Sequence, residues 1–246
     1  MIRGLYTAAS GMIYENKRQE NVAQNIANIQ TPGFKQSYIS AISQDKVISN
    51  NNGRNQLGSL SLKVSIDQQI LSLAQGDLRA TEEPLDFAIE GNGFFTLQGP
   101  NGNLYTRDGR FHVDETGTLV SKEGYPVLVM NVQGNQQTVQ VNEDISVSQT
   151  GSFNIANTTY QFVISNLTNS DQLVYQGDSA FAYNGPVGIQ ETDFIIHQNM
   201  IEGANVDATD ALVQMIAINR SLQTNSRVLT TIDETLKSSV SEIGRV

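Results

Sequence analysis

Hydrophobic residues recur every seven positions near the C-terminal end of the chain. One column of the repeat consists of Met215, Leu222, Leu229, Leu236 and Ile243, and a second, three residues earlier each time, consists of Leu212, Asn219, Ser226, Asp233 and Val240. Such an alternation of four and three residues is typical of a coiled coil. Because no proline or glycine lies between Asn205 and Glu242, the pattern predicts one helix of about 37 residues, about 55 Å long.

The second column of this repeat is polar at three consecutive positions, Asn219, Ser226 and Asp233. Polar residues inside a coiled-coil seam lower stability, and they often fix the register or belong to a wet, shared interface. The other interpretation is a partly solvated edge of a hairpin of helices within one chain. The sequence leaves both interpretations open.

The N-terminal segment has a similar helical spacing of apolar residues from Arg3 to Gln30. The apolar positions are Leu5, Ala8, Met12, Val22, Ile26 and Ile29. This pattern predicts a helix of roughly 40 Å, with a seam that Glu15 and Gln19 interrupt. Thr31, Pro32 and Gly33 are expected to end the helix and bend the chain, because proline lacks a backbone donor and clashes with the preceding turn. Phe34 is expected to anchor that bend.

The middle of the chain changes to a period of two with frequent turn residues. Residues 94–98 and 103–107 predict two strands around the turn at 99–102, and residues 111–113 and 118–120 predict a second hairpin. Further strands are expected within 125–132, 138–141, 160–167 and 173–175, which gives eight to ten strands in all. Residues 50–55 are polar and are expected to be flexible or extended.

These patterns predict an α+β fold, in which long N- and C-terminal helices form a coiled-coil-like pair around a central all-β domain. The expected parts are a helix and bend at 1–34, an extended arm at 35–75, the β domain at 76–190, and a connector with the heptad helix at 191–246. Residues 1–40 carry four basic and two acidic groups, whereas residues 190–246 carry four basic and eight acidic groups. This difference in charge favours pairing of the two ends, although each exposed ion pair contributes less than about 1 kcal/mol.

The composition excludes several classes of function. The net charge of −10 disfavours binding to nucleic acid, and no apolar run reaches the roughly 20 residues that span a bilayer. The absence of cysteine excludes thiol catalysis and cysteine metal sites. Gly4, Ser10 and Gly11 interrupt the first apolar stretch, so we expect no cleaved secretory signal and either a cytoplasmic protein or another export route.

Candidate chemistry is sparse. The two histidines, His112 and His197, lack a third metal ligand at a recognisable spacing, and the acidic group of Glu82, Glu83 and Asp86 is expected to be a solvated turn. No phosphate loop, nucleophile elbow or dinucleotide loop is present. The sequence therefore predicts no catalytic, cofactor or metal site, no small-molecule substrate and no enzyme.

Four separated motifs resemble, in order, those of flagellar basal-body rod and hook proteins. They lie at residues 3–12 (RGLYTAASGM), 25–35 (NIANIQTPGFK), 76–111 (from GDL through EGNGFF to YTRDGRF) and 202–220 (from EGANVD to Met215 and Arg220). The resemblance implies a structural axial subunit whose terminal helices pack into a helical tube with the β domain outside. It also implies export in unfolded form through the flagellar type III apparatus, and partners that are copies of the chain and other rod or hook proteins.

This resemblance implies that the two helical segments form the assembly interface. It also implies a location in the flagellar basal body, outside the cytoplasmic membrane. Within this family, the short chain and the polar, glycine-poor segment at 50–75 are similar to the proximal rod protein, whereas distal rod proteins commonly have a longer arm there. A proximal rod position is therefore expected, with a distal rod position as the second choice. A rival of another class is a secreted adhesin or carbohydrate-binding module, for which Tyr105, Tyr125 and Tyr183 would be the aromatic platform. The predicted interface residues are Leu5, Met12, Val22, Asn25, Ile26, Asn28, Thr31, Pro32, Gly33, Phe34, Leu212, Met215, Asn219, Leu222, Ser226, Leu229, Asp233, Leu236, Val240 and Ile243.

Overall fold

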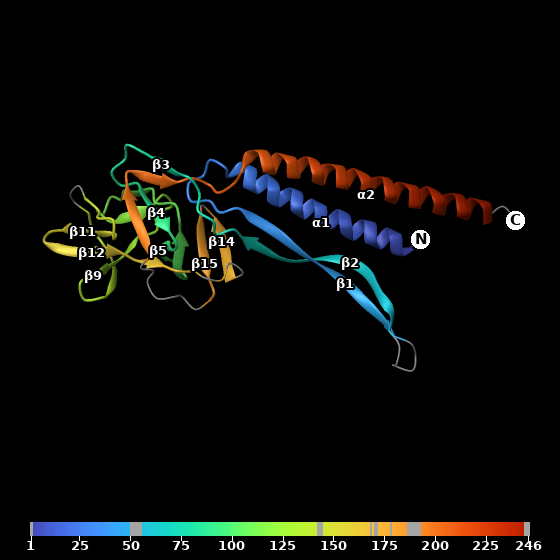
Figure 1. Ribbon diagram of the computed structural model, residues 1–246, viewed down its shortest axis with the longest axis horizontal. Coiled ribbons are helices and arrows are strands. Elements are labelled where there is room, and N and C mark those ends of the chain that lie inside the picture. The colour runs from blue at the N-terminus through green and yellow to red at the C-terminus, as the bar shows by residue number, and fades with distance from the viewer. Residues whose placement is uncertain are drawn as a thin grey trace. The chain divides into compact units, whose positions relative to one another are not determined.

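A computed structural model of the chain describes residues 2–49, 56–141, 145–167, 169, 172–177, 179–185 and 193–243. The chain divides into two compact units. The first, here called the helical unit, comprises Met1–Ala27, Ser37–Ile70 and Asp207–Val246; the second, the β unit, comprises Asn28–Gln36 and Leu71–Val206. Two terminal helices thus flank a β-rich middle, which confirms the predicted α+β class (Figure 1).

Two antiparallel helices lie side by side in the helical unit: α1 (Ile2–Ala27) and α2 (Ala208–Ile243) (Figure 1). Asp207 starts α2, because its Oδ1 accepts the amide hydrogens of Thr209 at 2.7 Å and Asp210 at 3.1 Å, which satisfies two of the free donors of the first turn. The α1 helix ends at Ala27, three residues before the predicted end at Gln30.

A two-stranded sheet completes the helical unit, formed by β1 (Ser37–Ser49) and β2 (Gln56–Leu71). These strands occupy most of the predicted extended arm, whereas its polar segment at 50–55 lies outside the described residues. Two side-chain amides of α1 hold the start of β1. Asn21 Nδ2 donates to Ser37 Oγ at 2.6 Å, and Asn25 exchanges hydrogen bonds with the Ser37 backbone at 2.9 and 3.1 Å.

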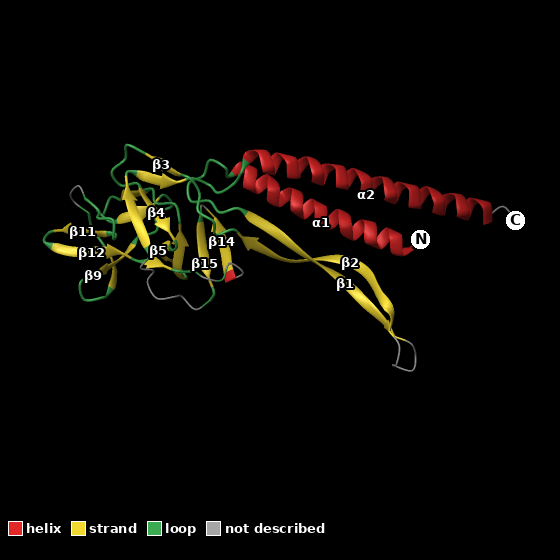
Figure 2. Ribbon diagram, in the orientation of Figure 1, coloured by secondary structure: helices red, strands yellow, loops and turns green. Residues whose placement is uncertain are grey.

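The β unit is built from one five-stranded sheet, one four-stranded sheet and smaller pairs (Figure 2). The five-stranded sheet has the order β13-β5-β6-β15-β14, and the four-stranded sheet has the order β10-β9-β12-β11; β16 pairs with β4, β17 with β3, and β7 with β8. The strands are β3 (Leu78–Ala80), β4 (Phe87–Gly91), β5 (Phe94–Gly99), β6 (Gly102–Thr106), β7 (Phe111–Val113), β8 (Leu119–Ser121), β9 (Leu128–Asn131), β10 (Gln136–Thr138), β11 (Ser152–Ile155), β12 (Thr158–Phe162), β13 (Ile164–Ser165), β14 (Leu173–Gly177), β15 (Ala180–Tyr183), β16 (Phe194–Gln198) and β17 (Met200–Glu202).

Both predicted hairpins are confirmed. Strand β5 pairs with β6 so that Gly99 lies opposite Gly102, on either side of the predicted turn, and β7 pairs with β8. The sequence missed β16, which pairs along its whole length with β4. As a result, this β unit extends beyond residue 190.

A cluster of phenylalanine rings forms the main core of the β unit. Phe95 is fully buried, and its ring lies edge-on to Phe111 at 5.1 Å and to Phe162 at 5.7 Å between centroids. Phe87 and Phe153 contact Phe162 at 5.2 and 5.1 Å. Because burial of each such side chain contributes about 1.5–3 kcal/mol, this cluster is a strong source of stability within one chain.

Candidate functional site

The seam of the helical unit follows a four-three spacing along α2. The fully or partly buried positions with this spacing are Ala211, Met215, Ile218, Leu222, Asn225, Leu229, Ile232, Leu236 and Ser239, and Gln214, Asn219 and Ser221 beside them are also partly buried. Ile232 and Asn225 lie against Gly4 and Gly11 of α1, where a side chain on either glycine would come within 3.4 Å. The predicted column from Met215 to Leu236 therefore lies in this seam, and the side chain of Ile243 lies outside the described residues.

Four of the five residues of the second predicted column are exposed in this structure. Leu212 and Val240 are 55% and 70% exposed, and Ser226 and Asp233 are also exposed. The second column lies one residue earlier, at Ala211, Ile218, Asn225, Ile232 and Ser239. This register places Ile218 and Ile232 in the seam at the positions that the predicted column assigned to Asn219 and Asp233, so the apolar area removed from water is larger.

Polar contacts also join the two helices. Gln19 Nε2 donates to Asn219 Oδ1 at 3.3 Å, and Ser221 Oγ donates to Glu15 Oε1 at 3.1 Å. Glu15 and Gln19, which interrupt the apolar pattern of α1, therefore bind polar partners on α2. Asn219 is the one member of the predicted second column that is partly buried.

The other predicted residues of α1 differ in their surroundings. Val22 is buried, whereas Leu5, Met12 and Ile26 are partly buried. Asn25 is 2% exposed and holds the start of β1.

Large apolar side chains remain exposed on the helical unit. Tyr6 and Ile13 of α1 are 66% and 62% exposed, and on α2 the exposed fractions are 60% for Val213 and 54% for Ile216. An open groove is lined by residues of both helices: Met12, Asn16, Leu222, Gln223, Ser226 and Arg227. Exposed apolar side chains that gather on one element are typical of a surface that contacts another protein.

The predicted bend lies in the β unit and is tightly packed there. Asn28 accepts a hydrogen bond from the backbone of Thr31 at 3.0 Å, and the Pro32 carbonyl oxygen accepts one from Ser179 Oγ at 3.1 Å. Gly33 has a φ of +68° and lies so close to the backbone of Asp108 that a Cβ atom would come within 2.2 Å of its nitrogen. Only glycine fits both requirements.

Phe34 is 3% exposed, and its ring lies edge-on to Tyr175 at 6.4 Å. Its side chain is therefore packed within the β unit.

Next to the bend, three charged side chains form a buried cluster: Lys35, Arg107 and Glu202. Lys35 Nζ donates to Glu202 Oε1 at 2.7 Å, and Arg107 Nη1 donates to Glu202 Oε2 at 2.9 Å. All three side chains are at most 3% exposed. The amide of Gly76 also donates to Glu202 Oε1 at 3.0 Å.

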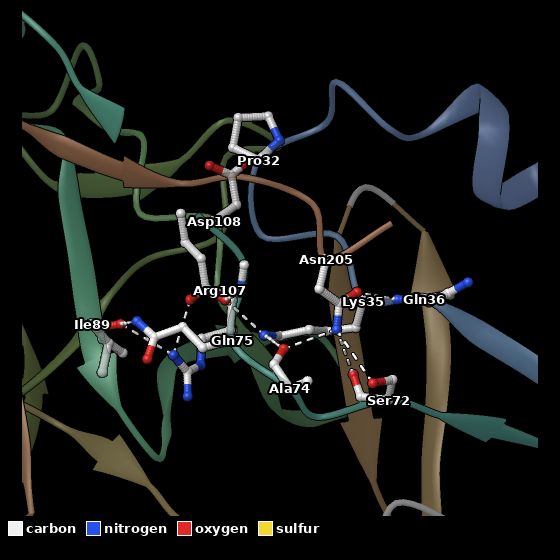
Figure 3. Close-up of polar contacts among 12 residues, drawn as sticks. Pro32, Lys35, Gln36, Ser72, Ala74, Gln75, Ile89, Arg107, Asp108 and Asn205 are labelled. Atoms are coloured by element: carbon white, nitrogen blue, oxygen red, sulfur yellow. Dashed lines mark hydrogen bonds and ion pairs between the residues drawn. The ribbon is translucent and has the colours of Figure 1, made fainter. Parts of the chain in front are cut away.

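Backbone carbonyl groups satisfy the two cations further (Figure 3). Lys35 donates to the Ala74 carbonyl oxygen at 2.7 Å, and Arg107 donates to those of Ile89 at 3.2 Å and Gly91 at 2.7 Å. Burial lowers the pKa of Lys35, while the Glu202 carboxylate opposes that shift. Burial likewise lowers the pKa of Arg107, whose guanidinium stays charged at physiological pH. The cluster thus holds two cations and one carboxylate.

The sequence did not single out this cluster, although each of its residues lies within a motif. Lys35 follows Phe34, Arg107 follows a buried strand, and Glu202 precedes Gly203. In the sequence, each of these charged residues stands beside residues expected to be buried. This pattern does not show which charged side chains contact one another, because Glu202 is 167 residues from Lys35 and 95 from Arg107.

The structure offers little chemistry beyond this cluster. Within the described ranges, no three His, Cys, Asp or Glu side chains gather into a possible metal site, and no described helix is long and apolar enough to cross a membrane. His197 Nε2 contacts Glu90 Oε2 at 2.6 Å.

Asp86 is 7% exposed, so its predicted place in a solvated turn is wrong, and burial raises the pKa of its carboxyl group. Tyr105 is 2% exposed and cannot serve in an exposed aromatic platform.

Comparison with known proteins gives matches along most of the chain. Three family descriptions match: "Flagella basal body rod protein" at residues 5–35, "Flagellar hook protein FlgE/F/G D1 domain" at 88–157, and "Flagellar basal body rod FlgEFG protein C-terminal" at 197–242. The flagellar basal-body rod protein FlgG of Bacillus subtilis is 31% identical over 264 positions, covering 98% of each chain. FlgG of Agrobacterium fabrum is 32% identical, with 95% of this chain and 96% of that protein covered. The rod protein FlgF of Rhizobium meliloti is 29% identical, with 99% of each chain covered.

Proposed function

Because this chain belongs to the flagellar basal-body rod protein family, and is a structural subunit of the flagellar rod and not an enzyme, we propose that it polymerises through its terminal helices. In this proposal the polymer is a helical tube in the basal body that transmits torque and conducts exported subunits. The observation that carries the proposal is the set of large apolar side chains exposed on α1 and α2.

The exposed residues suit contacts between copies. Val213 and Ile216 lie on α2, outside the seam with α1, so the helix pair of one chain leaves them in water. Covering them with a neighbour gains about 25 cal/mol per Å² of apolar surface. A contact between two different patches of identical subunits does not close on itself and so generates a helical filament.

The seam within the helical unit supports a further detail. We propose that α1 and α2 pack as an antiparallel coiled coil, since the buried positions of α2 alternate by four and three residues. The predicted interface residues that are exposed, Leu212, Ser226, Asp233 and Val240, would then contact neighbouring subunits.

Two expectations from the family resemblance complete the proposal. The subunit is exported unfolded by the flagellar type III apparatus, and it occupies the proximal part of the rod. The proximal position is supported by the short arm at residues 35–75, whose described residues form strands β1 and β2; distal members are expected to have a longer arm.

The substitution Ile216→Asp tests the assembly surface. Ile216 is 54% exposed, so a charge there should leave the melting curve of the monomer unchanged and abolish incorporation into basal bodies, because assembly would bury an unpaired carboxylate. Thr224→Asp on the same helix is a matched control with an exposed polar residue. Normal incorporation and motility of Ile216→Asp would remove this face from the assembly mechanism.

A further inference from the structure

Two distant segments of the β unit are joined next to the buried charge cluster. The N-terminal connection is here residues 28–36, which follow α1, and the C-terminal connection is residues 202–206, which precede α2. Four hydrogen bonds link them: Gly33 N–H to the Glu202 carbonyl oxygen at 2.8 Å, Lys35 Nζ to Glu202 Oε1 at 2.7 Å, Gln36 N–H to Asn205 Oδ1 at 2.7 Å, and Asn205 N–H to the Phe34 carbonyl oxygen at 3.4 Å.

The two connections contribute charges of opposite sign to the cluster. Arg107 belongs to neither connection, and its guanidinium is held by the carbonyl oxygens of Ile89 and Gly91. Glu202 in the C-terminal connection carries the one carboxylate of the cluster, and Lys35 in the N-terminal connection carries the second cation. If Lys35 is absent, the guanidinium of Arg107 and the carboxylate of Glu202 remain as an ion pair with no net charge.

Docking of Lys35 before Glu202 is unfavourable. If Lys35 entered before Glu202, two buried cations would lie near each other with only carbonyl oxygens as partners. Buried charges without a counter-charge are strongly destabilising. The amide of Gly33 would also lack its acceptor, the Glu202 carbonyl oxygen.

We propose that the cluster is an interlock that makes docking of the N-terminal connection conditional on the C-terminal connection. Glu202 docks first against Arg107, and Lys35 then joins the pair. The connection that comes first in the chain is therefore fixed last, and a β unit that lacks residues 202–205 leaves residues 33–36 undocked.

Hydrogen exchange measured on the full-length monomer tests this order. In Lys35→Met, exchange at the amides of Gly33 and Gln36 should become faster by at least about tenfold, because the N-terminal connection loses its ion pair. The amide of Gly203, which donates to the Asp77 carbonyl oxygen at 2.8 Å, should keep its wild-type rate. In Glu202→Gln, exchange at all three amides should become faster.

Glu90→Gln is the matched control, because it makes the same chemical change in the β unit at a half-exposed carboxylate that contacts His197 Nε2. It should change none of these rates. If Glu202→Gln does not fold, Asn205→Ala replaces it, since this variant removes the acceptor of the Gln36 amide from the C-terminal side and should release Gln36. Equal acceleration at Gly33 and Gly203 in Lys35→Met would overturn the order. Unchanged protection of Gly33 and Gln36 in the Glu202 or Asn205 variant would overturn the interlock itself.

Discussion

In the β unit, the rings of Phe87, Phe95 and Phe162 are fully buried, whereas in the helical unit Tyr6 and Ile13 are more than 60% exposed. The first unit completes an aromatic core within one chain. The second has a seam between two helices but leaves other apolar residues in water. This difference indicates that the β unit gains its stability from its own residues, whereas the helical unit leaves apolar surface in water.

The two units also place their charges differently. The β unit buries Lys35, Arg107 and Glu202 together, whereas the ion pair of Lys17 and Glu20 on α1 is more than half exposed. An exposed pair on a helix contributes only a few tenths of a kcal/mol. A buried carboxylate that loses its partners costs far more.

The largest effect is expected in the aromatic core. Phe95→Ala should lower the free energy of unfolding of the β unit by about 3–5 kcal/mol, because it removes two ring contacts and leaves a cavity. Equilibrium denaturation followed through tyrosine fluorescence or near-ultraviolet circular dichroism measures the change. A loss of under about 1 kcal/mol would show that the cluster is not the main source of stability.

A smaller effect is expected in the seam of the helices. Leu229 is only partly buried, so Leu229→Asp should lower the free energy of unfolding of the helical unit by about 1–3 kcal/mol. Far-ultraviolet circular dichroism should show the loss of helix. The transition of the β unit should be unchanged, and a matched shift of both transitions would contradict the independence of the units. Thr230→Asp, the exposed neighbour, is the control.

The smallest effect is expected from pH. Burial places the pKa of Lys35 below its ordinary value of 10.5, so the unfolded chain binds more protons between these two pKa values. The free energy of unfolding of the β unit should therefore rise with pH within this window. Below the folded-state pKa of Lys35, its destabilising contribution is fully present. Lys35→Met should make the curve flatter, and an equal slope in both proteins would assign the pH dependence to other groups.

Features that depend on neighbours in the chain could be predicted from the sequence. The turn at 99–102 and the bend at Pro32 and Gly33 follow from the local demands of glycine and proline. The long C-terminal helix follows from its apolar period and the absence of breakers. The start of α2 at Ala208 agrees with the aspartate before it.

Features that depend on distant partners could not be predicted. The apolar column from Met215 to Leu236 is compatible with a companion column on either side of it, and only the packing of α1 selects Ile218 and Ile232 over Asn219 and Asp233. Strand β16 was missed because its partner β4 lies about 100 residues earlier. The buried charge cluster was missed for the same reason.

The hydroxyl groups of α2 are satisfied by the helix itself. Thr224, Thr230, Thr231, Thr235, Ser239 and Ser241 each donate to a carbonyl oxygen three or four residues earlier in the helix. These hydroxyl hydrogens are already used, whereas the oxygens can still accept, and the exposed side chains of the same stretch include Asp233, Glu234 and Lys237. A surface that packs on this part of α2 therefore meets charged groups and hydrogen-bond acceptors, but no free hydroxyl donor from these six residues.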